Sequence, residues 1–152
     1  MNIKGFRLLL FSLFFSLCSF SFAQTASEMD AMLAANTVSA ARAARFVLGA
    51  ADLLPAGVSG ADAEKAAYDM AKSKGWIKAA AGEALTMKDT AFLMMNAFNL
   101  KGGVMYSLSG NPRYAYREMV YQKLIQGRTD QSMKLSGAKL LLILDRVMRN
   151  EE

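Results

Sequence analysis

The chain has 152 residues, with 18 basic and 13 acidic side chains, one cysteine and no histidine. The absence of histidine excludes a histidine general base, a cysteine–histidine nucleophile pair and the commonest zinc sites. We find no glycine-rich phosphate-binding loop, no metal-ligand spacing and no nucleophile elbow. Carboxylate-only chemistry stays open, but Asp62, Asp89 and Asp130 stand where helix caps are expected. The composition therefore predicts a protein that is not an enzyme and that uses no cofactor or metal.

Residues 1–23 have the pattern of a secretory signal peptide. Lys4 and Arg7 precede an apolar run over 8–17, and small residues up to Ala23 provide the expected cleavage site. A retained membrane anchor is the alternative, but the apolar run is shorter than the ~20 residues that span a bilayer. We expect cleavage, export to the periplasm or cell envelope, and no transmembrane segment afterwards.

Cleavage would leave residues 24–152 as a single domain and would remove Cys18, the only cysteine. Lipid attachment at Cys18 is disfavoured because Leu17, which is not a small residue, precedes it. The exported chain would then have no disulfide, so packing alone must stabilise it in an oxidising compartment. Export also argues against nucleic acid as a partner.

Apolar residues at helical spacing predict an all-α fold, and no convincing strand pattern is present. Thr86 and the pair Asn111-Pro112 are expected to open helices, and Gly75 is expected to end one. The connector 101–110 combines Gly and Ser with apolar residues, so we expect an ordered segment packed on the domain. The expected helices span about 37–54, 59–75, 86–100, 111–126 and 132–149.

Two of these helices, 86–100 and 132–149, are apolar around most of their circumference, which is typical of buried helices. We expect them to form the centre of the domain together with 37–54, with the amphipathic helices outside. Asn96 lies inside one of them, and it would need a hydrogen-bond partner such as a neighbouring backbone group.

The chain also aligns with itself, which indicates an internal repeat. An offset of 48 pairs Trp76 with Leu124 and Leu85 with Met133 without a gap, and an offset of 47 pairs Val38 with Leu85. Two units consist of a helix, an apolar pair, a loop and a long apolar helix, and a weaker third copy lacks the first helix. A period of this length predicts pseudo-repeated helix-loop-helix units that pack as a single helical domain, because no unit can bury its own apolar face.

These units resemble the S-layer homology repeat, in which a helix, a glycine with apolar anchors, a loop and a Thr-Arg-Ala-Glu-like helix start follow one another. The resemblance implies three pseudo-symmetric units that bind cell-wall polysaccharide in the grooves between them through the motif arginine. The matching positions here are Ala40, Met87 and Leu135, so that arginine is missing from all three units. The resemblance therefore supports the fold more than the activity. The segments that carry it are 38–42, 74–77, 85–91, 123–125 and 133–138.

Charge is distributed unevenly along the chain. Residues 24–100 contain 7 basic and 8 acidic side chains, whereas residues 101–149 contain 9 and 3. A basic half can bind anionic partners, or it can be a set of solvated helix faces. Tyrosine can stack on sugars and arginine can hold carboxylates, although tyrosine at helical spacing also occurs at core edges. The candidate ligand or partner surface comprises Lys101, Tyr106, Asn111, Arg113, Tyr114, Arg117 and Tyr121.

Two functions are consistent with these patterns. The first is a non-catalytic exported cell-envelope protein that associates with cell-wall polysaccharide or peptidoglycan through its basic half. The second is a protein-interaction subunit of a periplasmic or outer-membrane assembly, which the missing arginines favour. A contiguous apolar patch between Val104 and Tyr121 would favour a protein partner, and a polar groove lined by Arg113, Tyr114 and Arg117 would favour a glycan.

Overall fold

The computed structural model describes residues 26–151, so the predicted signal peptide lies outside the described residues. The chain divides into two units, Met1–Ala34 and Ala35–Glu152, and the described part of the first contains a helix over residues 26–33. No strand forms among residues 26–151, which confirms the predicted all-α class. In the same range, no helix combines the length and the apolar composition needed to cross a membrane. The helices of the second unit are α2 (Ala40–Ala50), α3 (Gly60–Ser73), α4 (Met87–Ala97), α5 (Val104–Ser109), α6 (Pro112–Tyr121) and α7 (Gly137–Glu151).

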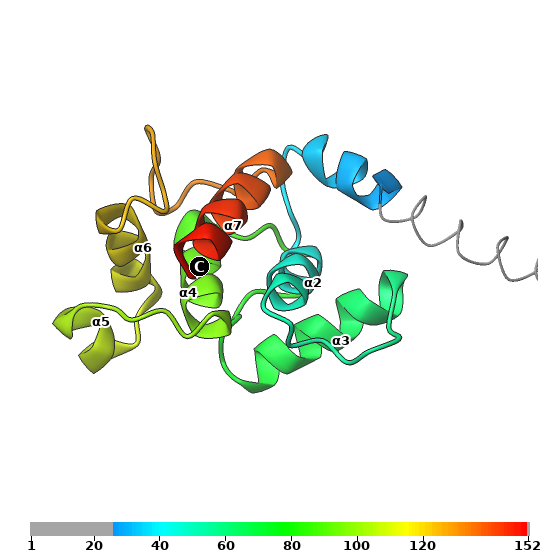
Figure 1. Ribbon diagram of the computed structural model, residues 1–152, viewed down its shortest axis with the longest axis horizontal. Helices are drawn as coiled ribbons and strands as arrows, with labels where there is room; N and C mark the ends of the chain where they lie inside the picture. The colour runs from blue at the N-terminus through cyan, green and yellow to red at the C-terminus, as the bar shows by residue number, and fades with distance from the viewer. Residues whose placement is uncertain (1–25, 152) are drawn as a thin grey trace, which may run out of the picture. The chain divides into compact units, whose positions relative to one another are not determined.

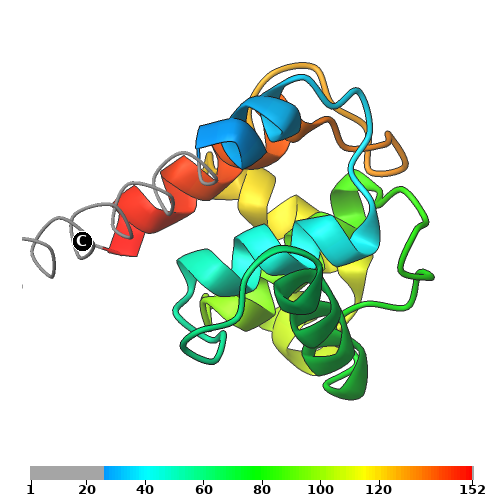
Figure 2. The same cartoon turned by 90° about the vertical axis from the view of Figure 1, so that its right-hand side faces the viewer.

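The buried centre lies where the periodicity predicts. Helix α2 packs on α3, α4 and α7 (Figure 1). Helix α4 packs on α6, and α6 also contacts α5. The second view also shows α3 against α2 (Figure 2). Asn96, inside α4, donates its side-chain amide to the carbonyl of Phe92 at 2.7 Å, the backbone partner that was expected. The buried residues of the central helices are Ala40, Ala43, Ala44, Val47 and Leu48 in α2, Met87, Ala91, Leu93, Met94 and Met95 in α4, and Leu140, Ile143, Leu144 and Val147 in α7.

Three of the helices end earlier than their apolar periodicity predicts, because a residue other than glycine adopts the left-handed conformation. Asp52, Asn99 and Lys123 have φ of 54°, 50° and 61° just after α2, α4 and α6. In each case the N–H of the next residue donates a hydrogen bond to the carbonyl five positions before it. Gly75, which is also left-handed, allows the same hydrogen bond after α3. Gly127, which directly follows the predicted helix 111–126, lies in the loop beyond this turn.

The predicted helix starts are correct at α4 and α6. Thr86 accepts a hydrogen bond from the N–H of Asp89 at 3.4 Å, and Asn111 accepts one from the N–H of Arg113 at 2.9 Å. The cap expected at Asp130 is wrong, because that carboxylate accepts the N–H of Ser132 inside the loop before α7.

A closed ring of backbone hydrogen bonds joins the three segments that lead into the central helices. The N–H of Val38 donates to the carbonyl of Leu135 at 2.9 Å, and the N–H of Leu135 donates to the carbonyl of Leu85 at 3.0 Å. The N–H of Leu85 completes the ring by donating to the carbonyl of Val38 at 3.0 Å. All three side chains are buried. The ring therefore fixes the starting points of α2, α4 and α7 relative to one another.

The first turn of each central helix is also satisfied by a loop from elsewhere in the chain. The first N–H groups of an α-helix have no partner within the helix itself. Here the first helical N–H of α2, α4 and α7 donates to a loop carbonyl, in the pairs Ala40 with Glu83, Met87 with Met133 and Gly137 with Ala35, each at 2.9 Å. In this hydrogen-bond pattern Gly137 takes the place of Ala40 and Met87, whereas the predicted offset of 48 pairs Met87 with Leu135.

The backbone hydrogen bonds do not follow the predicted offset of 48 between Leu85 and Met133. In the ring, Leu85 corresponds to Leu135, whereas the alignment paired it with Met133, which is exposed. The shift arises in the loop after residue 125, which is two residues longer than the loop after residue 77. Two tyrosines that are 48 positions apart show that this loop is the longer one. The hydroxyl of Tyr68 donates to the carbonyl of Ala79 at 3.0 Å, and the hydroxyl of Tyr116 donates to the carbonyl of Thr129 at 2.9 Å, so the acceptors are further apart in sequence than the donors.

We predict that Leu140→Ala lowers the free energy of unfolding by about 2–5 kcal/mol, because it leaves a cavity in the shared core. Leu142→Ala, two residues along the same helix, should change it by less than about 0.5 kcal/mol because Leu142 is exposed. Urea denaturation followed by circular dichroism measures both. Equal losses in the two variants would contradict the position of α7 in the core.

Candidate functional site

Helix α6 presents one row of polar and aromatic side chains away from the core. Ala115 and Met119 are buried on the face that packs against α4. Residues at 114, 117, 118 and 121 recur at helical spacing outside that face, so their backbone positions form one row along α6. The row consists of Tyr114, Arg117, Glu118 and Tyr121.

Beside α6 lies α5, a helix of 6 residues in which no residue is buried. Val104 is 74% exposed and Leu108 is 81% exposed, and Met105 is also exposed. Glycines flank the helix on both sides, and Gly110 ends it with φ of 53°. An isolated exposed apolar residue is ordinary, but several on one short helix form a patch that another surface can cover.

Tyr106 attaches α5 to the core. Its ring packs edge-on against Phe92 of α4, with centroids 6.4 Å apart and planes at 74°. The side-chain amide of Asn96 lies 3.4 Å from its hydroxyl oxygen. Gly102 is needed for this packing, since a Cβ there would come within 2.3 Å of Tyr106 Cδ1. Burial raises the pKa of the Tyr106 hydroxyl, and the hydrogen bond from Asn96 partly opposes that rise.

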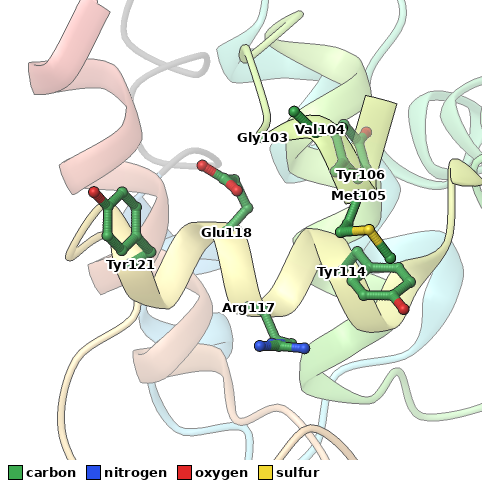
Figure 3. Close-up of a pocket in the computed structure, with 8 residues that line it drawn as sticks. All are labelled: Gly103, Val104, Met105, Tyr106, Tyr114, Arg117, Glu118 and Tyr121. Carbon is green, nitrogen blue, oxygen red and sulfur yellow. The ribbon is translucent and has the colours of Figure 1, made fainter. Parts of the chain in front are cut away.

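A groove of about 290 Å³ lies between α5 and α6 (Figure 3). Figure 3 shows Tyr114 and Tyr121 at the two ends of the α6 row, with Met105 pointing toward Tyr114. Arg117 and Glu118 leave α6 on different sides, and Glu118 points toward Gly103. The residues that line the groove are Gly103, Val104, Met105, Tyr106, Tyr114, Arg117, Glu118 and Tyr121.

Four of the predicted surface residues line this groove, namely Tyr106, Tyr114, Arg117 and Tyr121. The other three do not. Lys101 is exposed, and its carbonyl accepts a hydrogen bond from Gln122 at 2.9 Å. Asn111 caps α6. Arg113 is exposed and is not among the residues that line the groove.

The individually predicted surface residues do not include Gly103, Val104, Met105 and Glu118, although the sequence pointed to the interval from Val104 to Tyr121 for an apolar patch. The connector 101–110 was expected to pack on the domain, because apolar residues are usually buried. The signal that could have found the helix is the apolar run Val104-Met105-Tyr106 between Gly102-Gly103 and Gly110.

The groove lies in a basic part of the chain. Residues 101–128 contain five basic side chains and a single acidic one, Glu118. The amide of Gln122 donates to the Glu118 carboxylate at 3.1 Å. Within the described part of the chain, neither Arg113 nor Arg117 forms an ion pair. Both guanidinium groups are therefore available to an anionic group outside the chain.

The residues that line the groove provide groups that bind ligands through stacking, ionic and apolar contacts. They provide three phenol rings, one guanidinium, one carboxylate and the thioether of Met105. Over residues 26–151, no group of three or more carboxylates gathers closely enough to hold a metal ion. Comparison of the chain with protein-family models, curated proteins and solved structures gives no match. The resemblance to the S-layer homology repeat therefore stays a prediction.

We predict that Gly102→Ala displaces Tyr106 and loosens α5, because the new methyl group would overlap the base of the tyrosine ring. The overlap should cost about 1–3 kcal/mol of stability and make α5 a faster site of chymotrypsin cleavage. Gly82→Ala is the matched control, since no atom lies within 4 Å of a Cβ at that position. Similar cleavage rates in both variants would argue against Tyr106 as the attachment of α5.

The raised pKa of Tyr106 predicts a loss of this attachment at alkaline pH. The folded state favours the neutral phenol, so its contribution is complete below the ordinary pKa of about 10. That contribution is lost as the pH rises through the higher folded value. The absorbance change at alkaline pH, taken as wild type minus Tyr106→Phe, should have its midpoint above the ordinary value. A midpoint at or below it would contradict the burial of this hydroxyl.

Proposed function

We propose that this protein is a non-catalytic, exported binding protein of the cell envelope, and that it holds a segment of another protein in the groove between α5 and α6. The observation that carries the proposal is the exposed apolar patch of α5, formed by Val104, Met105 and Leu108. The proposal of export rests on the signal-peptide pattern of residues 1–23.

A protein partner suits the groove better than a glycan does. A partner that covers Val104 and Leu108 removes their side chains from water, and each Å² of apolar surface so buried contributes roughly 25 cal/mol. Tyrosine, methionine and arginine are enriched in protein interfaces, and all three line this groove. A polar groove that includes Arg113 would have favoured a sugar, but Arg113 does not line it.

Association with cell-wall polysaccharide or peptidoglycan is the second candidate function, favoured by the basic residues of 101–149. The positions that match the motif arginine of S-layer homology repeats give it no support. Ala40 and Met87 are buried, and Gly137 has no side chain. If this function holds, the protein sediments with isolated sacculi and added salt releases it.

We predict that affinity capture from envelope extracts recovers a stoichiometric protein partner, and that Leu108→Asp weakens its binding about tenfold or more. The reason is that a charge at this exposed position opposes burial of the α5 patch. Met133→Asp is the matched control, because Met133 is also exposed but lies in the loop before α7. Calorimetry with the purified partner measures both variants.

The proposed function would be wrong if no partner were recovered and the protein remained a monomer. It would also be wrong if Leu108→Asp bound the partner as tightly as wild type. Circular dichroism before binding shows whether each variant keeps its helices.

A further inference from the structure

We infer that the segment held in the α5–α6 groove is an acidic peptide, in which carboxylates flank a large apolar side chain. This inference rests on the proposed function and specifies the class of partner.

The volume of the groove sets the size of what enters it. Pockets for drug-sized ligands measure roughly 300–1,000 Å³, so about 290 Å³ accommodates one or two side chains. The apolar part of the lining comes from Val104 and Met105 on α5 and the rings of Tyr106 and Tyr114. An aromatic or long aliphatic side chain therefore fits between the two helices, and the rest of the segment lies along the exposed surface of α5.

The two arginines beside the groove, Arg113 and Arg117, stand at positions where positive charge destabilises an isolated helix. Arg113 lies in the first turn of α6, where the helix dipole favours an acidic residue. Arg117 lies four residues later, and like charges at this spacing destabilise a helix. Both are exposed and unpaired among the described residues. An anionic partner relieves both unfavourable placements at once.

The single carboxylate of the region does not neutralise these arginines. Glu118 accepts a hydrogen bond from Gln122 and lies close to Gly103, with its carboxylate on a different side of α6 from Arg117 (Figure 3). A guanidinium can hold a carboxylate through two parallel hydrogen bonds. Arg117 in the lining, with Arg113 one turn away, therefore suits two acidic residues of one peptide.

The same charges disfavour a second copy of this chain as the occupant. In a two-fold dimer the same surface meets itself, so the arginines of the two copies would lie in one interface with Glu118 as the only acid of 101–128. A membrane surface is also a poorer fit. Helix α5 has only 6 residues, and its polar positions are Ser107 and Ser109, where a membrane-surface helix carries lysine or arginine.

Selection of a phage-displayed random-peptide library on the purified protein tests the inference. We expect enriched peptides with aspartate or glutamate on both sides of an aromatic or long aliphatic residue. Fluorescence anisotropy with a labelled enriched peptide should give binding that weakens as salt is added. The same peptide with its acids replaced by Asn and Gln should bind several-fold more weakly.

The double variant R113E/R117E gives the sharpest comparison, because it reverses the charge at the groove while keeping the apolar lining. It should lose the acidic peptide and select basic peptides instead. The double variant K74E/K78E is the charge-matched control, since both lysines are exposed beyond the end of α3 and neither lines the groove. That variant should bind the acidic peptide as wild type does.

Failure of the inference can be distinguished from failure of the proposed function. The selection could enrich apolar peptides that show no charge preference and that fail to bind the Leu108→Asp variant. That outcome would overturn the inference and leave the proposed function intact. Enriched peptides that bind Leu108→Asp unchanged would overturn both. Binding to phosphatidylglycerol vesicles but not to phosphatidylcholine vesicles, without competition from the acidic peptide, would replace the peptide by a lipid surface and overturn the inference.

Discussion

The ring of three backbone hydrogen bonds among Val38, Leu85 and Leu135 is the constraint on which the rest of the domain depends. Backbone groups buried away from water need partners, because an unpaired one costs about as much as a lost hydrogen bond. The ring satisfies its own donors and acceptors and brings three buried apolar side chains together. Since a helix starts directly after each segment, the position of one central helix cannot change without disturbing the other two. The site inherits this rigidity through α4, which carries Phe92 and Asn96 on the side that holds Tyr106.

The groove therefore lies between a rigid helix, α6, and a more loosely attached helix, α5. Helix α6 is capped by Asn111 and packs on α4 through Ala115 and Met119. Helix α5 has no fully buried residue and is linked to α4 through the half-buried Tyr106. Segments with few buried contacts have low local stability, and binding surfaces are often drawn from them. Such an arrangement suits a partner that orders α5 as it binds.

The sequence predicts the centre of this fold because hydrophobic burial dominates there. Apolar periodicity identifies α2, α4 and α7 as central, and capping chemistry identifies Thr86 and Asn111-Pro112 as helix starts. It fails where a local choice depends on tertiary contacts. Met133 and Leu135 are both apolar, so only the hydrogen bonds distinguish which one enters the core. The left-handed residue Lys123 is unpredictable for a similar reason, because lysine has no intrinsic preference for that conformation.

The site shows a different kind of failure, in which the residues depart from local rules together. Val104 and Leu108 are apolar yet exposed, and Arg113 places a cation at the helix end that favours acids. The sequence predicted tyrosine and arginine at a surface with apolar residues nearby between Val104 and Tyr121, but it did not predict that the connector would form an exposed helix. Sequences usually agree with their fold at every level, and disagreements concentrate where function requires them. In the α5–α6 region the apolar exposure and the unpaired charge lie on adjoining elements, so a single partner that is both apolar and acidic accounts for both departures.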